Sequence, residues 1–91
     1  MFKRQLQLGS IGSDVTALQQ FLNSHGFLVA KAGAGSPGRE TTLYGALTAA
    51  AVTRFQEANV GVILTPNGLK KGTGIFGPAS RQLVNQLSVS R

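Results

Sequence analysis

Two segments of this 91-residue chain begin with an aromatic residue followed by glycine. After each glycine, a hydroxyl residue stands three positions on, a valine seven positions on and a large apolar residue ten positions on. The matching sets are Tyr44, Gly45, Thr48, Val52 and Phe55 in the first segment, and Phe76, Gly77, Ser80, Val84 and Leu87 in the second. Because this spacing falls on one face of an α-helix, the repeat predicts two helices that start in the same way.

The residues at each start have physical roles that do not require a ligand. The aromatic ring can fold back on the first helical turns as in a hydrophobic staple, and glycine is tolerated at the N-cap. The hydroxyls of Thr48 and Ser80 can bond back toward the cap. Ile11-Gly12 is a looser copy of the aromatic-glycine pair. We therefore interpret the glycines and Phe76 as elements that start and dock helices.

A third helical pattern precedes these two, over residues 13–25. Its apolar residues recur at helical spacing, and Ser13 suits the N-cap. Asp14 stands where the helix dipole favours an anion, and Gly26 suits the position after the last turn. The residues on its apolar face are Val15, Leu18, Leu22 and His25.

The two repeated segments complete a mainly α fold. Residues 46–58 carry an apolar stripe that includes Ala51, and residues 78–87 carry one that includes Leu83, with Pro78 suited to the first helical position. The apolar runs 27–29 and 60–64 could pair as one short two-stranded ribbon. Residues 30–43 form a long loop, and 65–68 read as a tight turn. We predict a compact three-helix bundle over residues 5–88, with tails at 1–4 and 89–91.

The charge of the chain favours anionic partners. Nine Lys and Arg residues oppose three acids, which gives a net charge of +6. Nucleic acid and a wall polymer bearing carboxylates or phosphates are both candidates, although the basic residues are scattered and lack interleaved aromatics, which argues against nucleic acid. A generally soluble basic surface is the alternative. We see neither a secretory signal nor a membrane span, so export would imply that the chain is a fragment of a larger protein.

Reactive side chains are too few for a recognisable catalytic constellation. The chain has no cysteine, and His25 is its single histidine, which we interpret as packing or capping a helix end. Asp14 and His25 would lie about 16 Å apart along one helix, too far to act together. We predict a domain that is not an enzyme on its own and that holds no cofactor or metal.

The motifs together resemble the three-helix peptidoglycan-binding domain. The resemblance rests on an opening segment at residues 8–22, a central segment at 44–56 and a third at 74–83. Compared with the family, the loops 30–43 and 60–72 are longer, Tyr44 replaces a commoner Phe, and Ser80 replaces a commoner Thr. The matching structural residues are Gly12, Asp14, Val15, Leu18, Leu22, Gly45, Thr48, Val52, Phe55, Phe76, Gly77 and Leu83.

The resemblance implies a non-catalytic module that binds peptidoglycan glycan strands or stem peptides. Such a module would target a larger exported protein to an extracellular, periplasmic or wall-associated site, and we expect a monomer. Side chains that could hold carboxylates or sugars are Arg39, Glu40, Thr41, Tyr44, Lys70, Lys71, Thr73 and Arg81.

Several alternatives stay open at this point. Tyr44 could be a buried staple or a ligand platform, and we favour the staple. Gln19 and Gln56 match family positions but could simply hydrogen-bond the backbone between helices. The fold could also serve as a protein-interaction module or pro-segment, with nucleic-acid binding a more remote possibility.

Overall fold

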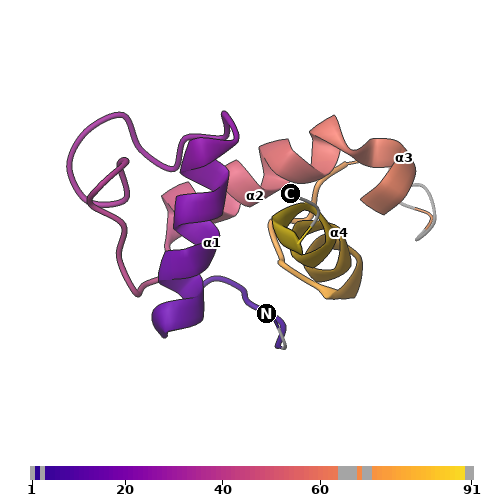
Figure 1. Cartoon of the computed structure of the whole chain (residues 1–91), viewed down its shortest axis with the longest axis horizontal. Coiled ribbons are helices and arrows are strands. Elements are labelled where there is room, and N and C mark those ends of the chain that lie inside the picture. Colours follow the sequence, from indigo (N-terminus) through magenta and orange to yellow (C-terminus); the bar gives the residue numbers. More distant parts are fainter. Residues whose placement is uncertain (1, 3, 64–67, 69–70, 90–91) are drawn as a thin grey trace.

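The computed structural model describes residues 2, 4–63, 68 and 71–89. Its elements are α1 (Ser13–Ser24), α2 (Ala46–Ala58), α3 (Val60–Ile63) and α4 (Pro78–Val89). Figure 1 shows α2 running behind the other elements, with α1 against one part of it and α3 and α4 near its other end. The three predicted helices and the mainly α fold are confirmed, with α3 as one additional turn.

A glycine stands at each end of α1, Gly12 before it and Gly26 after it. The N-cap is Gly12 rather than the predicted Ser13, which is the first helical residue. A Cβ at Gly12 would lie 2.7 Å from a carboxylate oxygen of Asp14, so only glycine fits there without displacing that side chain. At the other end Gly26 has a φ of +86°, as predicted, and the amide of Phe27 donates to the carbonyl of Leu22 at 2.9 Å. This is the bond of a Schellman motif.

A buried glutamine joins α1 to the start of α2. The Oε1 of Gln19 accepts a hydrogen bond from the amide of Thr41 at 2.6 Å. Its Nε2 donates to the carbonyl of Leu43 at 3.0 Å and to the hydroxyl oxygen of Thr48 at 2.9 Å. We call these four residues the first clamp. The hydroxyl of Thr48 therefore bonds Gln19 of α1, instead of bonding back toward the cap of its own helix.

The same arrangement occurs between α2 and α4. The Oε1 of Gln56 accepts from the amides of Thr73 and Gly74 at 2.8 and 3.1 Å. Its Nε2 donates to the carbonyl of Ile75 at 2.7 Å and to the hydroxyl oxygen of Ser80 at 3.1 Å. We call these five residues the second clamp. Both glutamines thus hydrogen-bond the backbone between helices, one of the alternatives that the sequence left open.

The aromatic residues before α2 and α4 lie in the core, as staples. Tyr44 and Phe76 are both fully buried. The hydroxyl of Tyr44 donates to the carbonyl of Gly74 at 2.6 Å, and this bond joins the start of α2 to the second clamp. Burial raises the pKa of this hydroxyl above its ordinary value, so it stays protonated as a donor.

The chain start packs against the repeated segments. Leu6 forms an isolated antiparallel bridge with Phe76, and Ile11 forms one with Leu43. Phe2, which the sequence left in a tail, meets the Phe76 ring edge-on with centroids 5.1 Å apart. Its amide and carbonyl both bond the Asn85 side chain, at 2.9 and 3.1 Å. The chain start therefore completes the packing around Phe76.

The possible two-stranded ribbon is not formed by the described residues of the runs 27–29 and 60–64. Residues 60–63, predicted as half of it, are the helix α3, and residues 27–29 are not in a strand. A short apolar run fits a strand or a buried helical turn equally well, and here Ile63 is buried at the α3 end of the core. The predicted turn at 65–68 lies mostly outside the described residues.

The core fills the space between α2 and the elements around it. The Cα radius of gyration is 12.0 Å, close to the value of about 12 Å that a chain of this length gives when compact. The buried apolar residues are Phe2, Leu6, Val15, Leu18, Phe21, Leu22, Val29, Tyr44, Ala51, Val52, Phe55, Ile63, Phe76 and Val84. Six of the twelve structural residues predicted from the motifs are therefore core residues: Val15, Leu18, Leu22, Val52, Phe55 and Phe76.

Candidate functional site

An open groove of about 250 Å³ lies beside the first clamp, between the long loop and the start of α2. Short aliphatic side chains form most of it, and the polar groups are few. The lining residues are Gln19, Val29, Ala34, Gly35, Thr41, Leu43, Gly45, Ala46, Leu47 and Thr48. In Figure 1 the loop curves away from the side of α1 before it returns to α2.

One asparagine of α1 holds the loop that walls the groove. The Nδ2 of Asn23 donates to the carbonyl of Gly35 at 3.0 Å and to the carboxylate of Glu40 at 2.9 Å. Its Oδ1 accepts from the amide of Val29 at 2.8 Å. Because these bonds reach both ends of the loop, the loop is fastened to α1 despite its length and its glycines.

The hydrogen bonds of the Glu40 carboxylate hold this loop in place. It accepts from Asn23 and, at 3.2 and 3.3 Å, from the amide of Gly38. The Asn23 hydrogen bond, followed by backbone hydrogen bonds, holds the pKa of Glu40 below its ordinary value. The carboxylate is therefore ionised and satisfied at neutral pH.

Two leucines give the groove its exposed apolar rim. Leu43 is 52% exposed and Leu47 is 57% exposed, although both line the groove. Leu47 stands in the first turn of α2, whose N-cap Gly45 offers no side-chain cap. Large apolar side chains held open at a concave surface are typical of a binding site.

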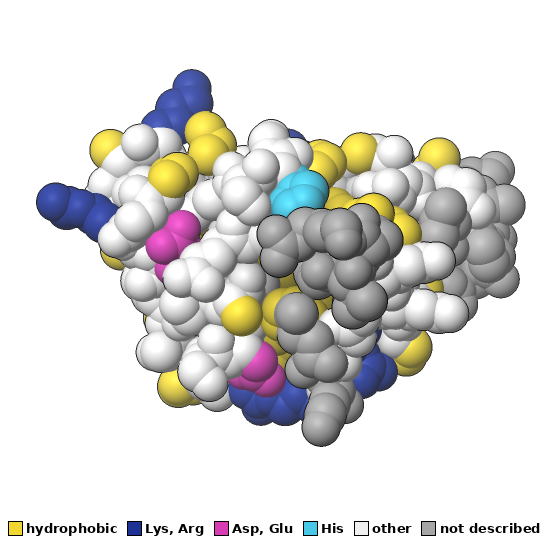
Figure 2. All heavy atoms as spheres, viewed as in Figure 1, with side chains coloured by type: hydrophobic (Ala, Val, Ile, Leu, Met, Phe, Trp, Pro, Cys, Tyr) yellow, Lys and Arg dark blue, Asp and Glu magenta, His cyan; other side chains and the backbone are white. Residues whose placement is uncertain are grey.

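The predicted ligand residues fall into two groups. Thr41 lines the groove, and Arg39 and Glu40 lie on the loop beside it. Tyr44 is fully buried, so its ring presents no face to a ligand in this structure. Figure 2 shows dark blue basic side chains projecting on the left of the molecule, where the loop runs in Figure 1.

The second group is made of residues before and within α4. Lys71 and Thr73 are exposed on the segment before α4, and Arg81 is half-buried in its first turns. The Nε of Arg81 is buried without an acceptor among the described residues. Lys70 lies outside the described residues. These side chains do not line the groove, so the structure does not bring the two groups together there.

Sequence reasoning missed the apolar half of the groove. Val29, Leu43 and Leu47 were not among the predicted ligand residues. A signal existed for Leu47, because it lies off the apolar stripe of α2 marked by Thr48 and Val52 and so has no core role to explain it. The groove position of Val29 depends on the path of the loop, which no short-range pattern encodes.

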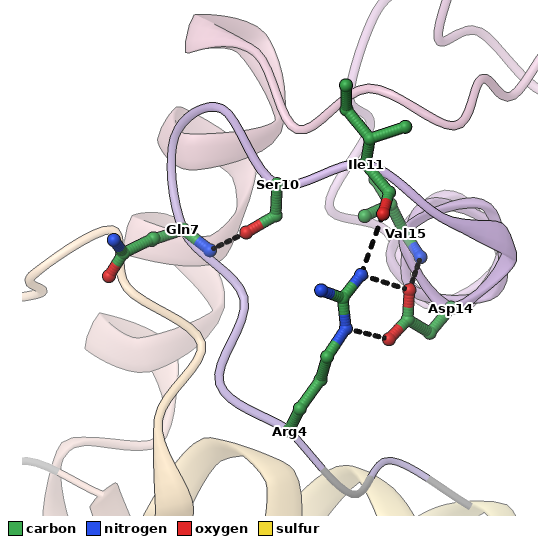
Figure 3. Close-up of polar contacts among 6 residues, drawn as sticks. All are labelled: Arg4, Gln7, Ser10, Ile11, Asp14 and Val15. Atoms are coloured by element: carbon green, nitrogen blue, oxygen red, sulfur yellow. Dashed lines mark hydrogen bonds and ion pairs between the residues drawn. The ribbon is translucent and has the colours of Figure 1, made fainter.

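Arg4 and Asp14 form an ion pair at the start of α1. Figure 3 shows Arg4 reaching from the chain start to Asp14, with Nε 2.7 Å from Oδ2 and Nη2 3.0 Å from Oδ1. Nη2 also donates to the Ile11 carbonyl at 2.8 Å. The Arg4 hydrogen bond holds the pKa of Asp14 below its ordinary value. The pair secures the helix start, consistent with the helix-start role predicted for Asp14.

The other acids and His25 make no metal-binding cluster in the described part of the chain. The Nδ1 of His25 lies 2.8 Å from the Phe21 carbonyl, and its ring stacks on Phe21 at 4.0 Å, so His25 packs on the end of α1. Within residues 2, 4–63, 68 and 71–89, no three His, Cys, Asp or Glu side chains gather as a metal site would need. None of the described helices has the length and apolarity needed to span a membrane.

Comparison with known families shows the family to which the chain belongs. The family model "Putative peptidoglycan binding domain" matches residues 11–60, more than half of the chain. The chain belongs to this family. The part of this peptidoglycan-binding domain that matches includes α1, the long loop and α2, and therefore every residue that lines the groove. Comparisons with curated proteins and with solved structures gave no match.

Proposed function

We propose that this domain is a non-catalytic module that binds peptidoglycan through the groove beside the first clamp. One observation carries the proposal: the segment that matches the family model, residues 11–60, contains every residue that lines the groove. In addition, the groove leaves apolar side chains exposed although a buried glutamine and an asparagine fix its walls. Such a rigid, partly apolar concavity suits a ligand that it does not need to remodel.

Binding here would serve attachment of a larger exported protein to the cell wall. A monomeric domain that carries the groove and no chemistry of its own would hold an attached catalytic or adhesive part near its polymer. The net charge of +6 supports this role, because wall polymers carry carboxylates and phosphates. The residues proposed to meet the ligand are the groove lining and the exposed side chains of the adjoining loop.

A pull-down with insoluble peptidoglycan at moderate salt tests the proposal. We expect retention above that of a small protein of equal net charge, and loss of retention in Leu47→Glu. A glutamate in the first turn of α2 suits the helix dipole, so this variant should fold. Gln82→Glu adds the same charge on the exposed face of α4 and serves as the matched control.

The two variants separate groove binding from charge. Normal retention of Gln82→Glu with loss in Leu47→Glu supports the groove. Equal loss in both variants would indicate simple electrostatic adhesion, and no retention of the unmodified domain would reject the proposed function.

A further inference from the structure

The aromatic side chains of the chain are all used in packing. The chain has five Phe, one Tyr and no Trp, and every one of them lies in the described part. All except Phe27 are buried, and Phe27 is half-buried with its ring edge-on to Phe55 at 5.5 Å. A sugar ring packs its apolar face on an open aromatic face, as rings do in other contacts. The domain offers no such platform, which argues against recognition of the glycan.

The groove instead suits small aliphatic groups on an extended chain. Its apolar lining comes from Val29, Ala34, Leu43, Ala46 and Leu47. These side chains present methyl groups, which favour contact with methyl-sized substituents such as alanine side chains. The amide of Gln19 beneath them is fully engaged in the first clamp and is not free for sugar hydroxyls.

The charge at the rim favours a ligand with carboxylates. Lys31 and Arg39 are exposed on the loop, and the Arg39 carbonyl accepts from the amide of the groove residue Gly35 at 2.8 Å. Glu40, the acid next to Arg39 in the chain, is bound to Asn23. In the described part of the chain neither cation has an ion-pair partner. The loop that walls the groove therefore presents positive charge to the solvent.

We propose that the groove binds the stem peptide of peptidoglycan and not its glycan strand. Alanine methyl groups of the peptide lie against Val29, Leu43 and Leu47, and peptide carboxylates face Lys31 and Arg39. This inference rests on the proposed function, because it names which component of peptidoglycan the same groove takes.

Calorimetry with separated components tests the assignment. The titrants are the free stem tetrapeptide and glycan strands from which an amidase has removed the peptides, and retention on intact peptidoglycan is measured in parallel. We expect the tetrapeptide to bind at least about tenfold more tightly than the stripped glycan. Equal or tighter binding of the stripped glycan overturns this inference and leaves the proposed function standing. Failure of the intact polymer to retain the domain rejects both.

A matched pair of variants locates the peptide. Leu43 and Ile75 hold the same position in the two clamps and are 52% and 40% exposed. Leu43→Ser should weaken tetrapeptide binding by about tenfold, whereas Ile75→Ser should leave it within about twofold, since serine removes apolar contact only where the ligand lies. Equal effects of the two variants would contradict the assignment. Circular dichroism of both variants checks that they remain folded.

Discussion

The two clamps use the same bonds but leave different surfaces beside them. At the first clamp the position before Thr41 is Glu40, whose side chain is held by Asn23, and a groove lies under the loop. At the second clamp the position before Thr73 is Gly72, and a Cβ there would lie 2.7 Å from the carbonyl oxygen of Thr53. The second segment therefore lies directly on α2.

The residues after each glycine extend this difference. The second position of α2 is Leu47, which is 57% exposed, whereas the second position of α4 is Ala79, which packs on the core. One scaffold thus holds an open groove beside the start of α2, whereas Gly72 and Ala79, among the described residues, pack on α2 and on the core. The comparison indicates that both clamps stabilise the fold and that the path of the loop before α2 creates the groove.

The largest expected effect is loss of a clamp glutamine. Gln56→Met keeps the volume but leaves buried backbone groups unpaired, so the free energy of unfolding should fall by about 3 kcal/mol. Gln19→Met should cost less, about 2 kcal/mol, because its partner Thr41 lines the open groove and water can reach it. Urea denaturation measures both values. If Gln19→Met lowers the free energy of unfolding more than Gln56→Met does, the first clamp is not the more open of the two.

Gly72→Ala tests the close approach of the second segment. The new methyl group would meet Thr53, so we expect a loss of about 2 kcal/mol. In the long loop, Gly33 has a φ of +74° and a Cβ added there would meet no packed atom within 4 Å, so Gly33→Ala should cost only the backbone strain of about 1 kcal/mol. Thermal unfolding of the two variants compares them, and equal shifts in Tm would argue against close packing at Gly72.

Tyr44→Phe removes the hydrogen bond that joins the start of α2 to the second clamp. It leaves the buried carbonyl of Gly74 without the hydroxyl, so the free energy of unfolding should fall by about 1–2 kcal/mol. Binding to peptidoglycan should be retained, because the ring stays buried in its place. A folded variant that no longer binds would show that Tyr44 acts on the ligand.

The smallest effect concerns the loop carboxylate. Because the pKa of Glu40 is lower in the folded state, this group adds stability above its ordinary pKa of 4.5, and that stability is lost as the pH falls through the folded-state pKa. The carboxyl carbon of Glu40 should titrate by NMR below that value, together with the amide of Gly38. An ordinary titration midpoint would mean that the Asn23 contact is not maintained in solution.

The sequence predicted the helices well because their determinants are local. The spacing of Val15, Leu18 and Leu22 encodes α1, and Gly26 encodes its end. The N-cap was misplaced by one residue because the deciding contact, the Arg4–Asp14 pair over Gly12, comes from another part of the chain. The helix at 60–63 was considered as half of a possible ribbon because a run of that length carries no usable period.

The candidate site was predictable only in part. Thr41, which lines the groove, and Arg39, which lies on the adjoining loop, were predicted because polar and basic residues in a long loop suggest function. The groove depends on Asn23, which bonds the carbonyl of Gly35 twelve residues later in the chain, and no sequence period signals such a contact. Burial of Tyr44 depends likewise on the carbonyl of Gly74, thirty residues away.

A chemical-shift titration of the ¹⁵N-labelled domain with soluble muropeptides tests the central claim most directly. If the groove beside the first clamp is the binding site, the amides that shift should be those of residues 29–35 and 41–48, while those of 71–80 stay in place. Saturable shifts confined to residues 71–80, or no shifts at muropeptide concentrations that compete with intact peptidoglycan, would contradict it.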